Sequence, residues 1–221
     1  MHRTAPFLIL STAVAAAGCA GCGKRPEAAP AATVLEASQP APTSPVAPPM
    51  SVATDPVRFE LTDNTEIEWT GYKIVGSHSG SFLMYEGTID LPDGTLDGAH
   101  FDVIIETMSV ITDNETLTGV VKGDSFFDVN DFPEATFVST GVDPDGEAYL
   151  VTGDLTLRDV TKTIRFPASM SVDDGVFTLT AEFTVNRRDW GIVYDGIGDN
   201  LLKDEVLISL QVEGEQAAGE G

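Results

Sequence analysis

The sequence Phe177-Thr178-Leu179-Thr180-Ala181-Glu182-Phe183-Thr184-Val185 decides the fold class of this chain. Apolar and polar residues alternate along the whole stretch, so one face of an extended segment is apolar and the other is polar. A two-faced strand of this kind is typical of an antiparallel sheet with one side buried and one side in water. The stretch therefore predicts a β-strand whose inner face is apolar.

The same alternation recurs on both sides of this stretch, at residues 66–70, 101–106, 149–157 and 206–213. Tight-turn sequences separate the runs, among them Pro92-Asp93-Gly94, Asp143-Pro144-Asp145-Gly146 and Asp173-Asp174-Gly175. About eight strands at this spacing predict an all-β domain, either a closed antiparallel barrel or a sandwich.

One stretch, residues 113–128, breaks the alternation. Asn114 and Glu115 are typical of a helix start, and Leu117, Val120 and Val121 follow at helical spacing. Gly123 stands near the expected end. We therefore expect one short helix among the strands.

The N-terminal residues 1–18 predict an export signal, with a short basic start and an apolar stretch too short to span a bilayer. The sequence Ala16-Ala17-Gly18-Cys19 is similar to the bacterial lipobox, whose cysteine is acylated and becomes the mature N-terminus. Cys22 also follows a glycine and is a second candidate. The alternative is an ordinary cleaved signal followed by two incidental cysteines. We expect a lipid anchor on Cys19, or else on Cys22.

Residues 19–55 are mostly Ala, Pro, Ser and Thr with few large apolar residues. This composition buries too little apolar surface to offset the entropy of ordering, so it predicts a disordered tether. We expect the folded barrel domain over residues 56–214 and a disordered tail over residues 215–221.

The charge balance restricts the partners. The chain has 35 Asp and Glu against 12 Lys and Arg, a formal net charge of −23. Such a surface repels phosphate backbones, which excludes nucleic-acid binding, and it repels anionic lipid head groups as well. Membrane association must therefore come from the N-terminal lipid anchor.

Candidate chemistry is sparse. The sequence has no P-loop, GxGxxG, GxSxG or HExxH motif, and both cysteines precede the folded part. The densest acidic cluster, residues 124–131, lacks the glycine and closing glutamate of a calcium loop. We therefore expect no enzymatic activity, no cofactor and no metal site.

His78 is either a residue of a turn or barrel mouth or a polar ligand contact. Arg187 either pairs with a carboxylate or reaches a polar ligand group.

Several motifs follow one another between residues 57 and 213: Trp69, Phe82, Glu86-Gly87 and Ile89 around His78; Asp124-Ser125-Phe126-Phe127-Asp128-Val129 before Phe132-Pro133-Glu134-Ala135-Thr136-Phe137; the stretch 153–162; and Arg187-Arg188-Asp189-Trp190-Gly191-Ile192 before Asp204-Glu205-Val206. In this order they resemble the YceI-like family. Members often carry Gly where this chain has Asp159, and His where it has Arg158.

The resemblance implies an extended eight-stranded antiparallel lipocalin-like barrel with a short helix near one end. Characterised members are exported bacterial proteins that hold a long isoprenoid or fatty-acyl chain in an apolar tunnel. It therefore implies a location in the bacterial cell envelope (the periplasm), a polyisoprenoid or similar ligand and, as in some relatives, a possible homodimer. The alternative is an acidic, stress-related envelope barrel that acts through partner binding without a lipid ligand.

On this reading, inward aromatic and aliphatic side chains form the tunnel wall, and for each of them simple barrel core is the alternative. The wall candidates are Trp69, Phe101, Ile105, Tyr149, Leu155, Phe166, Phe177 and Phe183. The mouth candidates for a polar head group are His78 and Arg187.

Overall fold

The structure, a computed structural model, describes residues 29–35, 55–194 and 201–217. The elements in this part of the chain are β1 (Thr33–Leu35), β2 (Val57–Leu61), β3 (Glu66–Lys73), β4 (Ser77–Phe82), β5 (Tyr85–Leu91), η2 (Pro92–Gly94), β6 (His100–Glu106), η3 (Thr107–Ser109), β7 (Val110–Thr112), α1 (Glu115–Lys122), β8 (Glu134–Asp145), β9 (Ala148–Leu157), β10 (Val160–Asp173), β11 (Val176–Asn186), η4 (Arg187–Trp190) and β12 (Leu202–Gln216).

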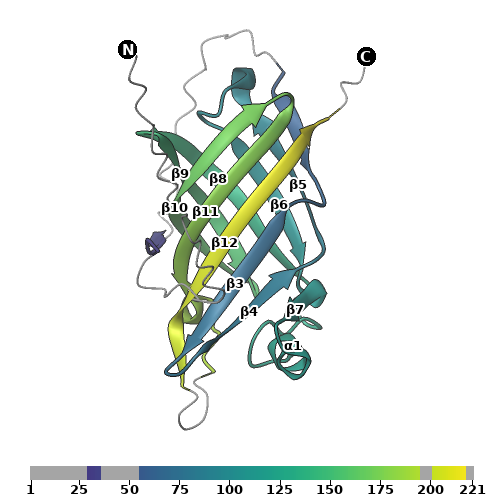
Figure 1. Cartoon of the computed structure of the whole chain (residues 1–221), viewed down its shortest axis with the longest axis vertical. Helices are drawn as coiled ribbons and strands as arrows, with labels where there is room; N and C mark the ends of the chain where they lie inside the picture. The colour runs from purple at the N-terminus through teal and green to yellow at the C-terminus, as the bar shows by residue number, and fades with distance from the viewer. Residues whose placement is uncertain (1–28, 36–54, 195–200, 218–221) are drawn as a thin grey trace, which may run out of the picture.

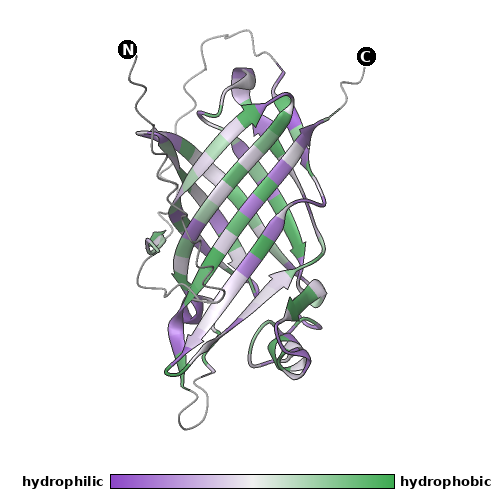
Figure 2. Ribbon diagram, viewed as in Figure 1, coloured by the Kyte–Doolittle hydropathy of each residue, from purple (hydrophilic) through white to green (hydrophobic). Residues whose placement is uncertain are grey.

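Eight of these strands close into an antiparallel barrel, as predicted (Figure 1). Around the ring the order is β10, β9, β8, β6, β5, β2, β12 and β11, and β11 pairs again with β10. Apolar and polar residues alternate along β11 and β12 (Figure 2), so each strand turns one face inward and one outward. The pairing of β10 with β11 over residues 169–173 and 176–180 closes the ring.

Breaks in the wall separate three pairs of consecutive strands: β2 and β3, β4 and β5, and β6 and β7. The strands β3, β4 and β7 form a second stretch of wall. β2 and β3 both pair with β12, β2 at 214–216 and β3 at 202–211. Likewise β2 pairs with β5 and β5 with β6, whereas β3 pairs with β4 and β4 with β7. At the break between β4 and β5, the backbone N–H groups of Leu83 and Met84 both donate to Ser109 Oγ, at 3.1 Å each. The barrel therefore continues at its lower end in Figure 1 as the sheet β12–β3–β4–β7.

The predicted short helix is confirmed and follows β7 at this lower end (Figure 1). The Asn114 side chain accepts a hydrogen bond from the backbone N–H of Leu117 at 3.0 Å, which caps the first turn. Glu115 stands in the first turn and Lys122 in the last, which suits the helix dipole. The helix buries Val121 toward the barrel interior.

Residues 29–35, which the sequence assigned to the tether, lie against the barrel wall. Val34 of β1 is the register partner of Ile164, and the Ala32 N–H donates to the Thr184 carbonyl at 2.8 Å. β10 and β11 pair with each other only over residues 169–173 and 176–180, so β1 contacts both strands below that point. Ala32 and Val34 pack against the core, which explains why this part of an Ala- and Pro-rich segment is ordered. The remaining residues of the predicted tether before Asp55 lie outside the described residues, as does the predicted signal.

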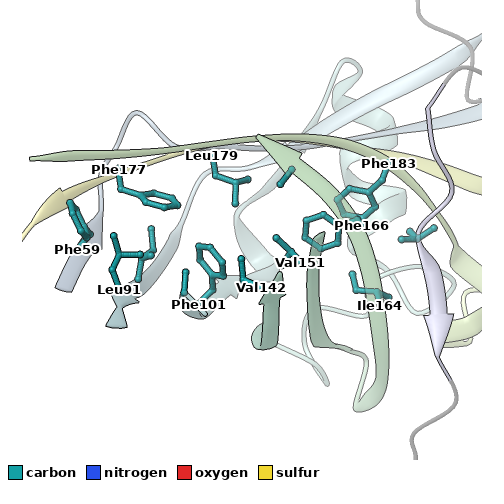
Figure 3. Packing of buried hydrophobic residues seen from close by; sticks show 14 of the residues in the cluster. Phe59, Leu91, Phe101, Val142, Val151, Ile164, Phe166, Phe177, Leu179 and Phe183 are labelled. Atoms are coloured by element: carbon teal, nitrogen blue, oxygen red, sulfur yellow. The ribbon is translucent and has the colours of Figure 1, made fainter. Parts of the chain in front are cut away.

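Packed aromatic rings close one end of the barrel (Figure 3). Phe177 is fully buried between Phe59 and Phe101, with ring centroids 6.1 and 5.9 Å away. Ile89 and Leu91 of β5 are buried beside these rings. Side chains therefore fill this end of the barrel. β12 continues to Gln216, two residues into the predicted tail.

Candidate functional site: an apolar cavity with a cationic end

A cavity of about 590 Å³ occupies the barrel interior beyond the filled end. Its walls come from inward residues of β3, β4, β6 and β8 to β12, and from α1 with the loop after it. This volume falls in the range of pockets that enclose small organic ligands. The lining is almost wholly aliphatic and aromatic, so the cavity suits an apolar guest.

Two glycines let large rings lie flat against the wall. A Cβ on Gly80 would stand 2.4 Å from the Trp69 ring, and a Cβ on Gly153 would stand 2.4 Å from the Phe137 ring. Trp69 and Gly80 are register partners on β3 and β4. Any larger residue at either glycine would push an aromatic ring toward the lumen. The glycines therefore help to keep the cavity open.

Six of the eight predicted wall residues line the cavity: Trp69, Phe101, Ile105, Leu155, Phe166 and Phe183. Phe177 and Tyr149 do not. Phe177 belongs to the filled end, and Tyr149 is a partly buried residue packed against the core. Both face inward as their alternation predicts, but alternation carries no information on depth along the barrel. Ligand contact by the six lining residues stays a prediction.

Sequence reasoning missed several lining residues that lie outside regular alternation. Phe126 and Phe127 come from the loop after α1, and the Phe127 ring packs edge-on against Trp69 and Phe82. No periodicity could have found a loop residue. Lys73 was missed although a signal existed, because Ile67, Trp69 and Gly71 place it at the next inward position of β3.

At the end of the cavity opposite Phe177, three polar side chains contact one another in a row. The Lys73 ammonium contacts His78 Nε2 at 3.0 Å, and His78 Nδ1 contacts the Asp113 carboxylate at 2.9 Å. Since an ammonium can only donate, Nε2 accepts from Lys73 and the imidazole proton lies on Nδ1, where it donates to Asp113. Lys73 and His78 both line the cavity, and ligand contact by His78 stays a prediction. Asp113 precedes α1 and is held by its N–H bond to the Ser79 carbonyl at 3.0 Å.

Arg187 also lines the cavity but is engaged by the protein. Its guanidinium is 4% exposed and donates to the carbonyls of Ile192, Leu202 and Lys203 and to the Asp204 carboxylate. Of the two roles predicted for Arg187, pairing with a carboxylate is the one the structure displays. This clamp fastens the start of β12 to the segment after η4.

Two titratable groups with shifted pKa values, Tyr85 and Asp90, have structural roles. Burial raises the pKa of Tyr85, and nearby Asp63 and Glu66 add to the rise. The Tyr85 hydroxyl donates to the Thr65 carbonyl at 2.6 Å, which holds the break between β2 and β3. On the outer surface of the filled end, the hydrogen-bonded Arg58 guanidinium lowers the pKa of Asp90.

Within the described residues, no group of three or more His, Cys, Asp or Glu side chains is placed to hold a metal ion. The acidic cluster at 124–131 forms no such group. The same part of the chain includes no helix long and apolar enough to cross a membrane.

The YceI-like domain model matches residues 57–214, the whole span of the barrel. The chain belongs to the YceI-like domain family. It is 33% identical over 153 residues to a UPF0312 protein of Yersinia pestis, covering 62% of this chain and 73% of the relative. A UPF0312 protein of Pectobacterium carotovorum is 32% identical over 138 residues, covering 60% of this chain and 71% of the relative.

Solved structures of similar fold include BcnA of Burkholderia cenocepacia, with a TM-score of 0.61 and 21% identity over 67% of this chain and 95% of that one. A protein described as a polyisoprenoid binding domain from Saccharophagus degradans has a TM-score of 0.58 and 16% identity, over 72% of this chain and 99% of that one. At these identities, the likeness shows a shared YceI-like fold.

Proposed function

We propose that this YceI-like protein is a binding protein that holds one long apolar chain, a polyisoprenoid or a fatty-acyl chain, inside its barrel. The observation that carries the proposal is the apolar cavity of about 590 Å³. Each CH₂ group moved from water into such a site contributes about 0.8 kcal/mol, so a long chain needs few polar contacts. The Saccharophagus degradans neighbour, described as polyisoprenoid-binding, supports this ligand class.

Native mass spectrometry of the full chain, purified from its own cells without detergent exchange, tests this proposal. We expect one additional mass per chain, removed by organic extraction and identified as an apolar chain. A bare protein mass that stays unchanged after incubation with excess polyprenol and fatty acid would refute the proposal. That result would favour the alternative, an acidic barrel that acts through partner binding.

We further propose that the protein is exported and tethered to a membrane of the cell envelope by acylation of Cys19. Support comes from the sequence alone, since residues 1–28 lie outside the described residues. In cells that express Cys19→Ala, fractionation should recover the protein in the soluble envelope fraction and no longer in the membrane. If only the Cys19→Ala/Cys22→Ala double variant is released, Cys22 carries the anchor. Membrane retention of the double variant would contradict the proposal.

A further inference from the structure

The charged residues that line the cavity are all basic. Among the described lining residues they are Lys73, His78 and Arg187, and no Asp or Glu joins them. The whole chain has 35 acidic residues and 12 Lys and Arg, so a random choice of charged residues would favour carboxylates. The described lining of the cavity therefore lacks anionic side chains in a chain that is rich in them.

These three residues lie at the same end of the barrel. Lys73 is the register partner of Leu202, whose carbonyl accepts a hydrogen bond from Arg187. His78 lies on the neighbouring strand β4, across the hairpin from Lys73 (Figure 1). Phe59 and Phe177 fill the opposite end, so the charged residues of the described lining lie at one end of the cavity.

Lys73 stands at an inward position of an otherwise apolar strand face. Ile67, Trp69 and Gly71 precede it on the same face of β3 and also line the cavity. Lys73 is half-buried, and an ammonium at the edge of an apolar lumen is stabilised by water or by an anion. The Lys73 contact described above is to His78 Nε2, a neutral acceptor. Within the part of the chain that the structure describes, no carboxylate oxygen lies within 4.0 Å of the Lys73 ammonium.

The other two basic groups already have partners in the protein. Arg187 is bound by backbone carbonyls and by Asp204, and the His78 Nδ1–H faces the Asp113 carboxylate. The Asp113–His78 contact orients the imidazole, and the imidazole in turn holds the ammonium at the cavity wall. An ammonium has three donors, and His78 accepts only one of them.

We propose that Lys73, positioned by His78 and Asp113, binds the anionic head group of the chain in the cavity, a carboxylate or phosphate oxygen. This inference rests on the proposed function and names the class of its ligand: an ionised amphiphile, whose tail fills the apolar lumen and whose head accepts hydrogen bonds from Lys73. Hydrogen bonds between charged partners are the strong ones.

The test compares three amphiphiles that share one alkyl tail and differ in their head group. Dodecanoate, dodecyl phosphate and dodecan-1-ol each displace a fluorescent apolar probe from the delipidated full chain at pH 8. We expect both anions to bind about tenfold or more tightly than the alcohol. Inorganic phosphate, which has no tail, should displace nothing at the same concentrations. Displacement by inorganic phosphate alone would show a site for free anions and overturn the head-group assignment.

Matched variants show which residue causes the preference for anionic head groups. Lys73→Met should abolish the preference for the anions and leave the dodecan-1-ol affinity unchanged, while Lys73→Arg should keep most of the preference. Lys203→Met is the control, because Lys203 is an exposed residue at the same end of β12 and carries the same charge. Equal losses in Lys73→Met and Lys203→Met would reduce the effect to general electrostatics and refute the inference. If dodecan-1-ol binds without any preference for the anions, the head-group inference fails and the proposed function stands. If none of the three amphiphiles binds, the proposed function fails.

Discussion

The two ends of this barrel share one sequence pattern and differ in what fills them. At one end, Phe177 packs between Phe59 and Phe101 and is fully buried. At the other end, equally inward residues such as Phe183 and Ile208 border a cavity of about 590 Å³. The comparison teaches that alternation determines which side chains face inward, whereas the position along the barrel determines whether a side chain is enclosed or borders the cavity.

Two features of the wall produce the difference. The strand breaks between β2 and β3 and between β4 and β5 set the sheet β3–β4–β7 apart from the eight-stranded ring, and α1 covers its edge. At the hollow end, Trp69 and Phe137 lie flat over Gly80 and Gly153 and do not cross the lumen. At the filled end, Phe177 lies between Phe59 and Phe101.

The largest expected effect contrasts matched truncations at the two ends. Phe177→Ala leaves a void in close-packed surroundings and should lower the free energy of unfolding by about 3–5 kcal/mol. Phe137→Ala removes a ring that already borders the cavity, so it should cost about 1–2 kcal/mol. Urea denaturation with a common slope measures both. Equal losses would mean that the two ends are packed alike.

A second contrast concerns the glycines. Gly80→Ala places a Cβ 2.4 Å from the Trp69 ring and 2.6 Å from the Ile111 carbonyl, so it should cost about 1–3 kcal/mol and narrow the cavity. Gly141→Ala is the control, since a Cβ there meets nothing within 4 Å. It should leave stability within about 1 kcal/mol of the original. Thermal unfolding and probe capacity, measured side by side, check the pair. A harmless Gly80→Ala would show that the Trp69 ring does not need this glycine.

A third contrast enlarges one ring at each end. Phe183→Trp adds apolar volume next to open space and should shorten the longest chain that binds, at a cost below about 1 kcal/mol. Phe177→Trp overpacks the filled end and should cost about 1–3 kcal/mol without changing chain-length preference. Chain-length preference is read from displacement of a fluorescent probe by fatty alcohols. Unchanged preference in Phe183→Trp together with a lowered melting temperature would count against an open cavity there.

The smallest expected effect is a pH dependence at the outer surface of the filled end. Two hydrogen bonds from Arg58, of 2.7 and 2.8 Å, lower the pKa of Asp90 below its ordinary 3.8. Because the folded-state pKa is the lower one, the contribution to stability is present above pH 3.8 and is lost as pH falls through the folded-state value. The melting temperature of the original protein should therefore approach that of Asp90→Asn as the pH is lowered from about 5 to about 2. A difference that grows as the pH falls would reverse the sign. The contribution is small because the Arg58 side chain is 54% exposed.

Alternation, turn residues and caps are local signals, and they were sufficient for an all-β domain, its inner face and the capped helix. They left a barrel and a sandwich open, and only the resemblance to the YceI-like family implied the barrel. Alternation along β11 assigned Phe177 and Phe183 to the same face correctly, but it could not show that one ring is enclosed and the other borders a cavity. That difference depends on strands far apart in the chain. β1 was missed because Ala31, Ala32 and Thr33 have little apolar surface, and only the space between β10 and β11 gives Ala32 and Val34 a place to pack. Lys73 was missed because the alternation was followed only over residues 66–70, three residues short of it.

The central claim, that one end of the barrel is hollow and takes a chain, is tested most directly by affinity against chain length. Isothermal titration of the delipidated full chain with a series of fatty alcohols measures the binding free energy of each. We predict a gain of about 0.8 kcal/mol for each added CH₂ until the cavity is full, and a plateau beyond that length. Affinities that are negligible or independent of chain length would contradict the claim, because such a barrel would be filled along its whole length.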